Sequence, residues 1–270
     1  MHAGNRTPTE EELEEIREER GLDDPLMLQF FRWIGDVFQL KLGKTVYTKE
    51  FVTKELRARL PYTLILTSTA IVIACLIALP SGILAATYPG SFIDGLLRAL
   101  ASSGIAIPRF WLGLLLMYFF SFKLHLLPQM GSGSFYHLIL PAVTLALGPA
   151  ATLARLTRAN MLEIMNNDYV ATARAKGLSN LKVTLKHVFR PALIPIITMI
   201  GLQFGFIFGG AVVVETVFSW PGIGKWAIDG IFNRDMPILR AFILLMGIMF
   251  MTINLIVDVA YSFLDPRIRY

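Results

Sequence analysis

A basic, alanine-rich stretch interrupts a sequence that is otherwise mostly apolar. The letters DYVATARAKGLSNLKVTLKHVFRP run from Asp168 to Pro191 and contain five positive charges, one negative charge and one glycine, Gly177. These side chains are not arranged for covalent chemistry, but the small alanines allow another surface to approach closely. The residues of this stretch therefore give no sign of a catalytic site.

The same stretch has the pattern of two short helices. Alanines at 171, 173 and 175 favour a helix over Tyr169–Lys176, and Gly177 can end it because glycine adopts the left-handed C-cap conformation at little cost. A second helix is expected to follow, with Pro191 in the first turn of the next apolar segment. The apolar face of this helix would hold Leu178, Leu181, Leu185 and Val188, and its basic face Lys182, Lys186 and Arg190.

Three interpretations of this protruding helix–turn–helix are compatible with its residues. Its basic face suits a helix that lies on anionic lipid. An ordinary solvated loop can have the same composition. The small residues between positions 171 and 175 also suit a segment that plugs into a cytoplasmic partner. The physical chemistry of the stretch leaves these three interpretations open.

Two polar residues in or near an apolar stretch are candidates for lining a transport pathway. Gln203 could hydrogen-bond a molecule that passes between the helices, although a hydrogen bond to another helix is the alternative. Glu215 lies near the outer end of the same stretch, ahead of the letters FSWPGIGKW. Its alternative role is to pair with Lys225 or Arg234.

Charged residues near the ends of apolar stretches have a structural interpretation. Asp258 lies four residues after an asparagine, and we expect it to pair with Arg155 or Arg158, which should lie at a similar depth. Arg109 and Arg240 are expected to extend their side chains toward the membrane surface.

The sequence contains no pattern for catalysis, metal binding or a bound cofactor. It has no G-x-x-x-x-G-K-[ST] run, so nothing in the sequence indicates that this chain hydrolyses ATP. The single cysteine, Cys75, cannot form an intrachain disulfide. The histidines are scattered and do not form a cluster with metal-ligand spacing: His2, His125, His137 and His187.

The composition of the chain indicates a polar head followed by a membrane body. Hydrophobic residues make up 54% of the chain and charged residues 17%, and the mean hydropathy is +0.57. Residues 1–60 hold 12 of the 20 acidic residues. The net charge of +5 does not indicate nucleic acid, because its excess lies in one loop beside apolar spans.

Five stretches are long and apolar enough to cross a membrane as helices. This pattern predicts an all-α integral membrane protein, and prolines within the spans fit it because neighbouring helices can satisfy freed backbone groups. Gly201, Gly205 and Gly209 share one face, which suits either packing within the subunit or a subunit interface. The predicted spans cover about 62–86, 99–122, 138–156, 193–217 and 238–264.

The distribution of basic residues predicts the orientation of the chain. Seven lysines and arginines but two acids lie between Arg155 and Arg190. The positive-inside rule then places this loop and the C-terminus in the cytoplasm of a cell in whose inner or plasma membrane the protein is embedded. With five spans, residues 1–60 would form an extracytoplasmic head, and residues 61–270 a transmembrane domain with cytoplasmic helices at about 160–190.

The predicted head has no apolar stretch that could lead it across a membrane. We therefore expect that a first span belongs before Met1 and is missing from this chain through truncation or a misassigned start. Translocation of the head together with the first hairpin is the alternative. The head itself has helical signals: Thr9 and Glu12 have capping-box spacing, and Gly21 would stop the helix.

The stretch around Gly177 resembles the cytoplasmic coupling motif of ATP-binding-cassette importer permeases, written Glu-Ala-Ala, three residues, Gly, nine residues, Ile-x-Leu-Pro. It departs from the motif at Ala171, where an acid is usual, and at Pro191, which comes one residue late. The letters YVATARAKGLS are similar to the branch that imports peptides and nickel. Further similar segments follow in the same order, including LPYTLILT, IPRFWLGLLL, GLQFGFIFGGAVVVETVFSWPGIGK and NLIVDVAYSFLDPRIRY.

The resemblance implies a type I importer permease, in a family whose members normally have six spans. Such a subunit pairs with a second homologous permease, docks on two cytoplasmic ATPase subunits that bind ATP and magnesium, and receives substrate from an extracytoplasmic binding protein. The implied substrates are di- and oligopeptides, with nickel or a nickel chelate as the alternative. The ATPase-coupling residues implied are Asp168, Tyr169, Ala171, Thr172, Ala173, Ala175, Lys176 and Gly177.

Two other classes of protein are alternatives to an ATP-driven importer. An ion-coupled secondary transporter would favour inverted repeats and ionisable groups at mid-membrane, whereas this sequence shows no convincing repeat and its charges lie toward span ends. A membrane scaffold would explain the partner-binding stretch, but not the resemblance of the outer segment.

Overall fold

The computed structural model describes residues 24–264, and nearly all of the chain's elements in this range are helices. No strand occurs among these residues, and one isolated bridge pairs Lys44 with Phe51. The predicted all-α class is therefore confirmed. The predicted capping box at Thr9 and Glu12 lies outside the described residues. The elements are α2 Leu26–Phe38, α3 Val52–Thr87, α4 Phe92–Ala106, α5 Arg109–Leu116, η1 Met117–Lys123, α6 Tyr136–Met165, α7 Asp168–Ala175, α8 Asn180–Lys182, η2 Val183–Phe189, α9 Arg190–Val217, α10 Ile223–Phe232 and α11 Met236–Leu264.

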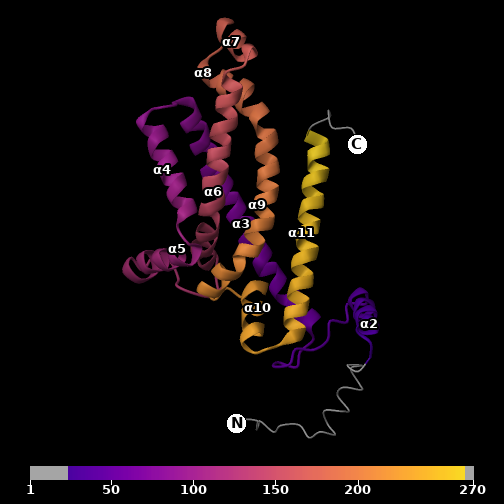
Figure 1. Cartoon of the computed structure of the whole chain (residues 1–270). Helices are drawn as coiled ribbons and strands as arrows, with labels where there is room; N and C mark the ends of the chain where they lie inside the picture. The colour runs from indigo at the N-terminus through magenta and orange to yellow at the C-terminus, as the bar shows by residue number, and fades with distance from the viewer. Residues whose placement is uncertain (1–23, 265–270) are drawn as a thin grey trace.

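Long helices run side by side through the molecule, and shorter elements gather at its two ends (Figure 1). α7 and α8 lie at one end, whereas α2 and α10 lie toward the opposite end. Four helical segments are long and apolar enough to cross a membrane: Val52–Thr87, Tyr136–Met165, Asn180–Val217 and Met236–Val257. They correspond to four of the five predicted spans.

The remaining predicted span, at about 99–122, is not one straight helix. Phe92–Ala106 and Arg109–Lys123 meet at an angle of 107°. The cause is local: Pro108 has no backbone N–H and disfavours a helical conformation at the residue before it. Ile107 accordingly has φ −77° and ψ 124°. The two halves count as a single span only as a broken one, and α5 runs across the bundle rather than along it (Figure 1).

The core lies where α3, α6 and α9 meet. α3 carries small residues at four-residue steps on one face, and Ala70, Ala74 and Ala78 are completely buried. Small side chains let α6 approach closely. At Gly82 the two helices lie so close that an added Cβ would be 2.6 Å from the Cβ of Thr157 and 2.8 Å from the carbonyl oxygen of Ala154.

Gly82→Ala is expected to destabilise the protein by about 1–3 kcal/mol, because the methyl group would force α3 and α6 apart. Gly95→Ala is the matched control, since it adds the same methyl group to α4 where no atom lies within 4 Å. Thermal unfolding in detergent measures both variants. Equal unfolding temperatures for the two variants would contradict the close α3–α6 contact.

The glycines of α9 pack against α11 within the subunit. A Cβ at Gly201 would clash with Val257, and one at Gly205 would lie 3.4 Å from the ring of Phe250. Gly209 has no atom within 4 Å of the corresponding position. Of the two interpretations of this glycine face, packing within the subunit therefore holds for Gly201 and Gly205.

A buried acid fastens the segment before α3 to the start of α11. Asp235 is fully buried, and its Oδ2 accepts hydrogen bonds from the backbone N–H groups of Val46 at 2.6 Å and Tyr47 at 3.2 Å. This contact joins residues almost 190 positions apart. It gives the end of the bundle opposite α7 a defined structure.

Candidate functional site

The predicted recognition stretch forms a protrusion at one end of the bundle (Figure 1). α7 begins at Asp168, two residues beyond the C-cap of α6, and ends at Ala175. The N–H of Gly177 donates to the carbonyl of Arg174 at 2.9 Å, and that of Leu178 to the carbonyl of Ala173 at 3.4 Å. These two bonds define a Schellman motif. Gly177 has φ +75°, which confirms the predicted glycine C-cap.

Two residues anchor α7 to the rest of the protein. Val170 is fully buried and Ala173 is 6% exposed, and both belong to a cluster with Met161, Val183 and Val188. Positions three apart share one face of a helix, so the opposite face of α7 is free. Of the eight predicted coupling residues, Ala173 is thus an anchor, and seven are exposed. We call these seven the coupling surface: Asp168, Tyr169, Ala171, Thr172, Ala175, Lys176 and Gly177.

The apolar face predicted for the second helix is confirmed at Leu178 and Val188, which pack in the same cluster, and is wrong at Leu181 and Leu185. Leu181 and Leu185 are 70% and 46% exposed, whereas Val183 and Val188 are buried. The prediction assumed 3.6 residues per turn, but Val183–Phe189 form a π-helix, in which hydrogen bonds span five residues. Val183 and Val188 are five apart and therefore face the same way.

The π-helix also explains why Pro191 comes one residue later than in the coupling motif. A π-turn holds one residue more than an α-turn, so the additional residue is absorbed between Gly177 and α9. Pro191 then falls in the first turn of α9, as predicted. The segment keeps its helical path into the membrane span despite its extra length.

Arg158 has a different partner from the predicted Asp258. Its Nε and Nη2 donate to Oδ1 and Oδ2 of Asp94 at 2.7 and 2.8 Å, and Asp94 is 1% exposed. Arg98 approaches the same carboxylate at 3.3 Å, and the N–H of Gly90 donates to it at 2.9 Å. This ion pair joins α4 to α6 near α7. The side chain of Asp258 lies outside the described part of the structure.

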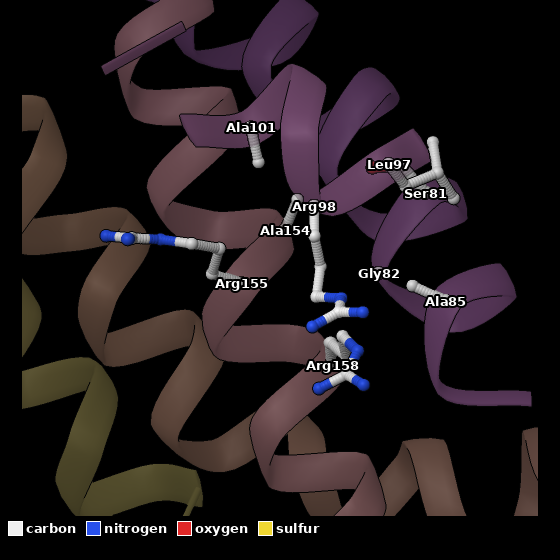
Figure 2. Close-up of a pocket in the computed structure, with 9 residues that line it drawn as sticks. All are labelled: Ser81, Gly82, Ala85, Leu97, Arg98, Ala101, Ala154, Arg155 and Arg158. Atoms are coloured by element: carbon white, nitrogen blue, oxygen red, sulfur yellow. The ribbon is translucent and has the colours of Figure 1, made fainter. Parts of the chain in front are cut away.

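The arginines around this ion pair do not all face the same way. Figure 2 shows the guanidinium groups of Arg98 and Arg158 close together in a hollow between α4 and α6. Arg155 points away from them (Figure 2). A pair between Arg155 and Asp258 therefore stays a prediction, and Arg158 is committed to Asp94.

Asp94→Asn is expected to lower the unfolding temperature, because it leaves Arg158 without its bidentate carboxylate. The double variant Asp94→Asn with Arg158→Gln should recover part of the loss. Asp229→Asn is the matched control, since Asp229 pairs with Lys225 on the exposed side of one helix. Thermal unfolding in detergent is the measurement. Additive losses in the double variant would show that the two side chains do not interact.

Glu215 is completely buried, and its carboxylate forms no ion pair with the ammonium of Lys225 or the guanidinium of Arg234. Its Oε2 accepts hydrogen bonds from the backbone N–H groups of Gly224 at 2.7 Å and Lys225 at 3.0 Å. The hydroxyl of Thr63 donates to Oε1 at 2.5 Å. The ammonium of Lys225 binds Asp229 instead. Glu215 therefore holds the first turn of α10, where a negative charge is favourable.

The two glycines in the letters PGIGK, Gly222 and Gly224, are required by the contact between Glu215 and the start of α10. An added Cβ at Gly222 would clash with the Glu215 carboxylate, and one at Gly224 would lie 2.6 Å from the Cα of Val212. The two glycines let the start of α10 lie directly on α9. The indole of Trp220 adds a hydrogen bond to the carbonyl of Tyr62 at 3.0 Å. The described geometry thus assigns Glu215 a structural contact.

Gln203, the other predicted pathway residue, is partly exposed in a hollow of about 300 Å³ at the break between α4 and α5. Thr152 of α6 and Arg109 of α5 line the same hollow. Arg109, expected to extend toward the membrane surface, thus shares this hollow with Gln203. The hollow joins polar side chains from three different helices.

Residues 78–270, more than half of the chain, match the family described as binding-protein-dependent transport system inner membrane component. The chain belongs to this family. The family resemblance found in the coupling motif is thereby confirmed.

Relatives and solved structures agree with this family. The chain is 45% identical to glutathione transport system permease protein GsiC of Escherichia coli O6:H1 over 258 residues, 96% of this chain and 84% of that protein. It is 44% identical to the protein of the same name from Salmonella paratyphi A over 255 residues, 94% and 83% of the two chains. Its fold is similar to that in the inward-facing MetNI methionine ABC transporter, with a TM-score of 0.67, 21% identity and coverage of 78% of this chain and 96% of that chain.

This membership settles the class of the protein. The chain is a multi-pass membrane permease subunit of an ABC importer. The sequence did not predict two features of the permease: the ion pair between Asp94 and Arg158, and the hollow lined by Arg109. An acid at the start of a mostly apolar helix, three residues after Ser91, was the available signal for Asp94.

Proposed function

We propose that this permease forms, with a second homologous permease, the membrane pathway of an ATP-driven importer of short peptides of about tripeptide size. The similarity to two glutathione permeases at 44–45% identity supports this substrate class, because glutathione is a tripeptide. An extracytoplasmic binding protein delivers the peptide, and two cytoplasmic ATPase subunits supply the energy.

The features of the coupling surface support the proposal that ATPase subunits dock on this chain. Val170 and Ala173 fix α7 to the bundle, so a push on its exposed face is transmitted to α6 and η2. Tyr169 is 46% exposed and offers an aromatic ring among small residues. Exposed Leu181 and Leu185 lie on the same protrusion and extend the apolar area available to a partner. Such apolar exposure favours a protein partner over a solvated loop.

The same proposal fixes the orientation of the chain. The basic protrusion and the C-terminus lie in the cytoplasm, and the end that contains α2 and α10 lies outside, facing the binding protein. Residues 1–60 then form an extracytoplasmic head, and residues 61–270 the transmembrane domain. ATP and magnesium are bound by the ATPase subunits.

Uptake by the complete complex in proteoliposomes tests the proposed function. The complex, with its binding protein, is supplied with radiolabelled glutathione, radiolabelled trialanine or radioactive nickel. We expect ATP-dependent uptake of at least one tripeptide, and none with a hydrolysis-deficient ATPase subunit. Uptake of nickel alone, or tripeptide uptake driven by an ion gradient without ATP, would overturn the proposal.

A further inference from the structure

The bend between α4 and α5 places a positive charge inside the bundle. Arg109 is the first residue of α5, and its partly exposed side chain lines the hollow that also contains Gln203 and Thr152. Four helices contribute to this hollow: α4, α5, α6 and α9. Its volume of about 300 Å³ is at the lower end of the range for small-ligand sites. The hollow is therefore large enough for part of a short peptide.

Arg109 has no carboxylate partner among the residues that the structure describes. The two buried acids of the neighbouring helices are already engaged, since Asp94 binds Arg158 and Glu215 binds the start of α10. An unpaired guanidinium among membrane helices is costly and usually marks a pathway or a ligand. An anionic group that enters the hollow would compensate this charge.

The guanidinium of Arg109 has a defined position against α9. An added Cβ at Gly210 would clash with its Nη1, so only glycine at this position lets the side chain lie there. Gln203 is seven residues before Gly210, two helical turns along the same face and about 10 Å away. Three extended residues also span about 10 Å. The α9 position beside the cation and the position that carries the amide are thus separated by about the length of an extended tripeptide.

The broken span adds to the attraction for an anion. The start of α5 faces the hollow through Pro108 and Arg109. The first N–H groups of a helix lack partners within it, and they carry partial positive charge. Half-helix ends of broken spans attract anionic substrate groups for this reason. The N-terminus of α5 and the guanidinium of Arg109 therefore both favour an anion in the hollow.

We propose that Arg109 binds a carboxylate of the transported peptide, while Gln203 hydrogen-bonds the peptide further along α9. This inference rests on the proposed peptide transport and adds a binding site within the membrane pathway. Arginine suits a carboxylate because its planar fork makes two parallel hydrogen bonds. Lysine at this position keeps the charge but loses the fork.

Uptake of a peptide and its amide by the complete complex tests this site. The probes are trialanine and trialanine amide, after calorimetry has shown that the binding protein binds both. Arg109→Gln is expected to lower kcat/KM about 10- to 100-fold for trialanine and less than 3-fold for the amide, since hydrogen bonds to charged groups contribute about 1.5–3 kcal/mol. Arg109→Lys should fall between wild type and Arg109→Gln. Gly210→Ala should have a smaller effect of the same kind, because it shifts the guanidinium without removing it.

The wild type and Arg109→Gln, each measured with trialanine and with its amide, form a four-membered cycle. This cycle separates recognition of the substrate carboxylate from other roles of Arg109. Arg240→Gln, which removes an exposed positive charge from α11, is the control and should leave the acid-to-amide ratio unchanged. Equal losses for acid and amide would overturn the proposal and show that Arg109 pairs with a protein group, such as an acid of the second permease. Unchanged uptake of both probes would overturn it as well. Failure of the wild-type complex to carry any tripeptide would instead contradict the proposed function.

Discussion

Glu215→Ala is expected to detach α10 from the C-terminal end of α9 and to lower the free energy of unfolding by about 3–5 kcal/mol. The carboxylate accepts hydrogen bonds from two backbone N–H groups and from the hydroxyl of Thr63. Its removal leaves these donors buried without acceptors, and each such group costs about 1–3 kcal/mol. Glu215→Gln should cost less, because its amide oxygen can still accept.

Thermal unfolding of the purified complex in detergent measures this loss, and transport should fall with it. Glu163→Ala is the matched control, since it removes an exposed acid from α6. Thr63→Val should have a smaller effect of the same kind. It removes only one of the three donors to the carboxylate, together with the acceptor of the Ile223 N–H. If Glu215→Ala lowered transport but not the unfolding temperature, Glu215 would belong to the pathway instead of the packing.

Gly177→Arg is expected to abolish transport while the complex still assembles in the membrane. Gly177 has φ +75°, a conformation that costs other residues about 1–2 kcal/mol. No atom lies within 4 Å of an added Cβ, so the arginine side chain would project from the coupling surface. Its bulk and charge would separate α7 from the ATPase. ATP hydrolysis by the complex should then no longer respond to the loaded binding protein.

Gly43→Arg separates this effect from backbone strain. Gly43 has φ +82° and open space around it, but it lies in the segment before α3 at the opposite end of the bundle. The same substitution there adds the same strain and the same charge. Uptake and ATP hydrolysis are measured for both variants in proteoliposomes. Undiminished transport by Gly177→Arg, or an equal loss in Gly43→Arg, would contradict docking at α7.

Local sequence patterns predicted much of the fold. Apolar stretches of sufficient length gave four of the spans, because the bilayer sets the length of a helix that crosses it. The cap at Gly177 was also predictable, since it depends on one glycine and the residues just before it. In both cases the physical cause lies within a few neighbouring residues.

The features that sequence reasoning missed depend on distant contacts or on a change of helix type. Glu215 and Thr63 are 152 positions apart, and Asp94 and Arg158 are 64 apart, so no local pattern links them. The apolar face at Leu181 and Leu185 was misplaced because η2 is not an α-helix. A proline in a long apolar stretch is compatible with a kink or a break, and only packing shows that the chain turns by 107° at Pro108.

Photo-crosslinking from the centre of the coupling surface tests the docking of α7 most directly. Thr172 is exposed and its substitution by a photoreactive residue leaves the anchors Val170 and Ala173 in place. In the complete complex, we predict a crosslink from this position to an ATPase subunit, whose yield changes when ATP is added. A crosslink to lipid alone, with none to an ATPase subunit in either nucleotide state, would contradict the account.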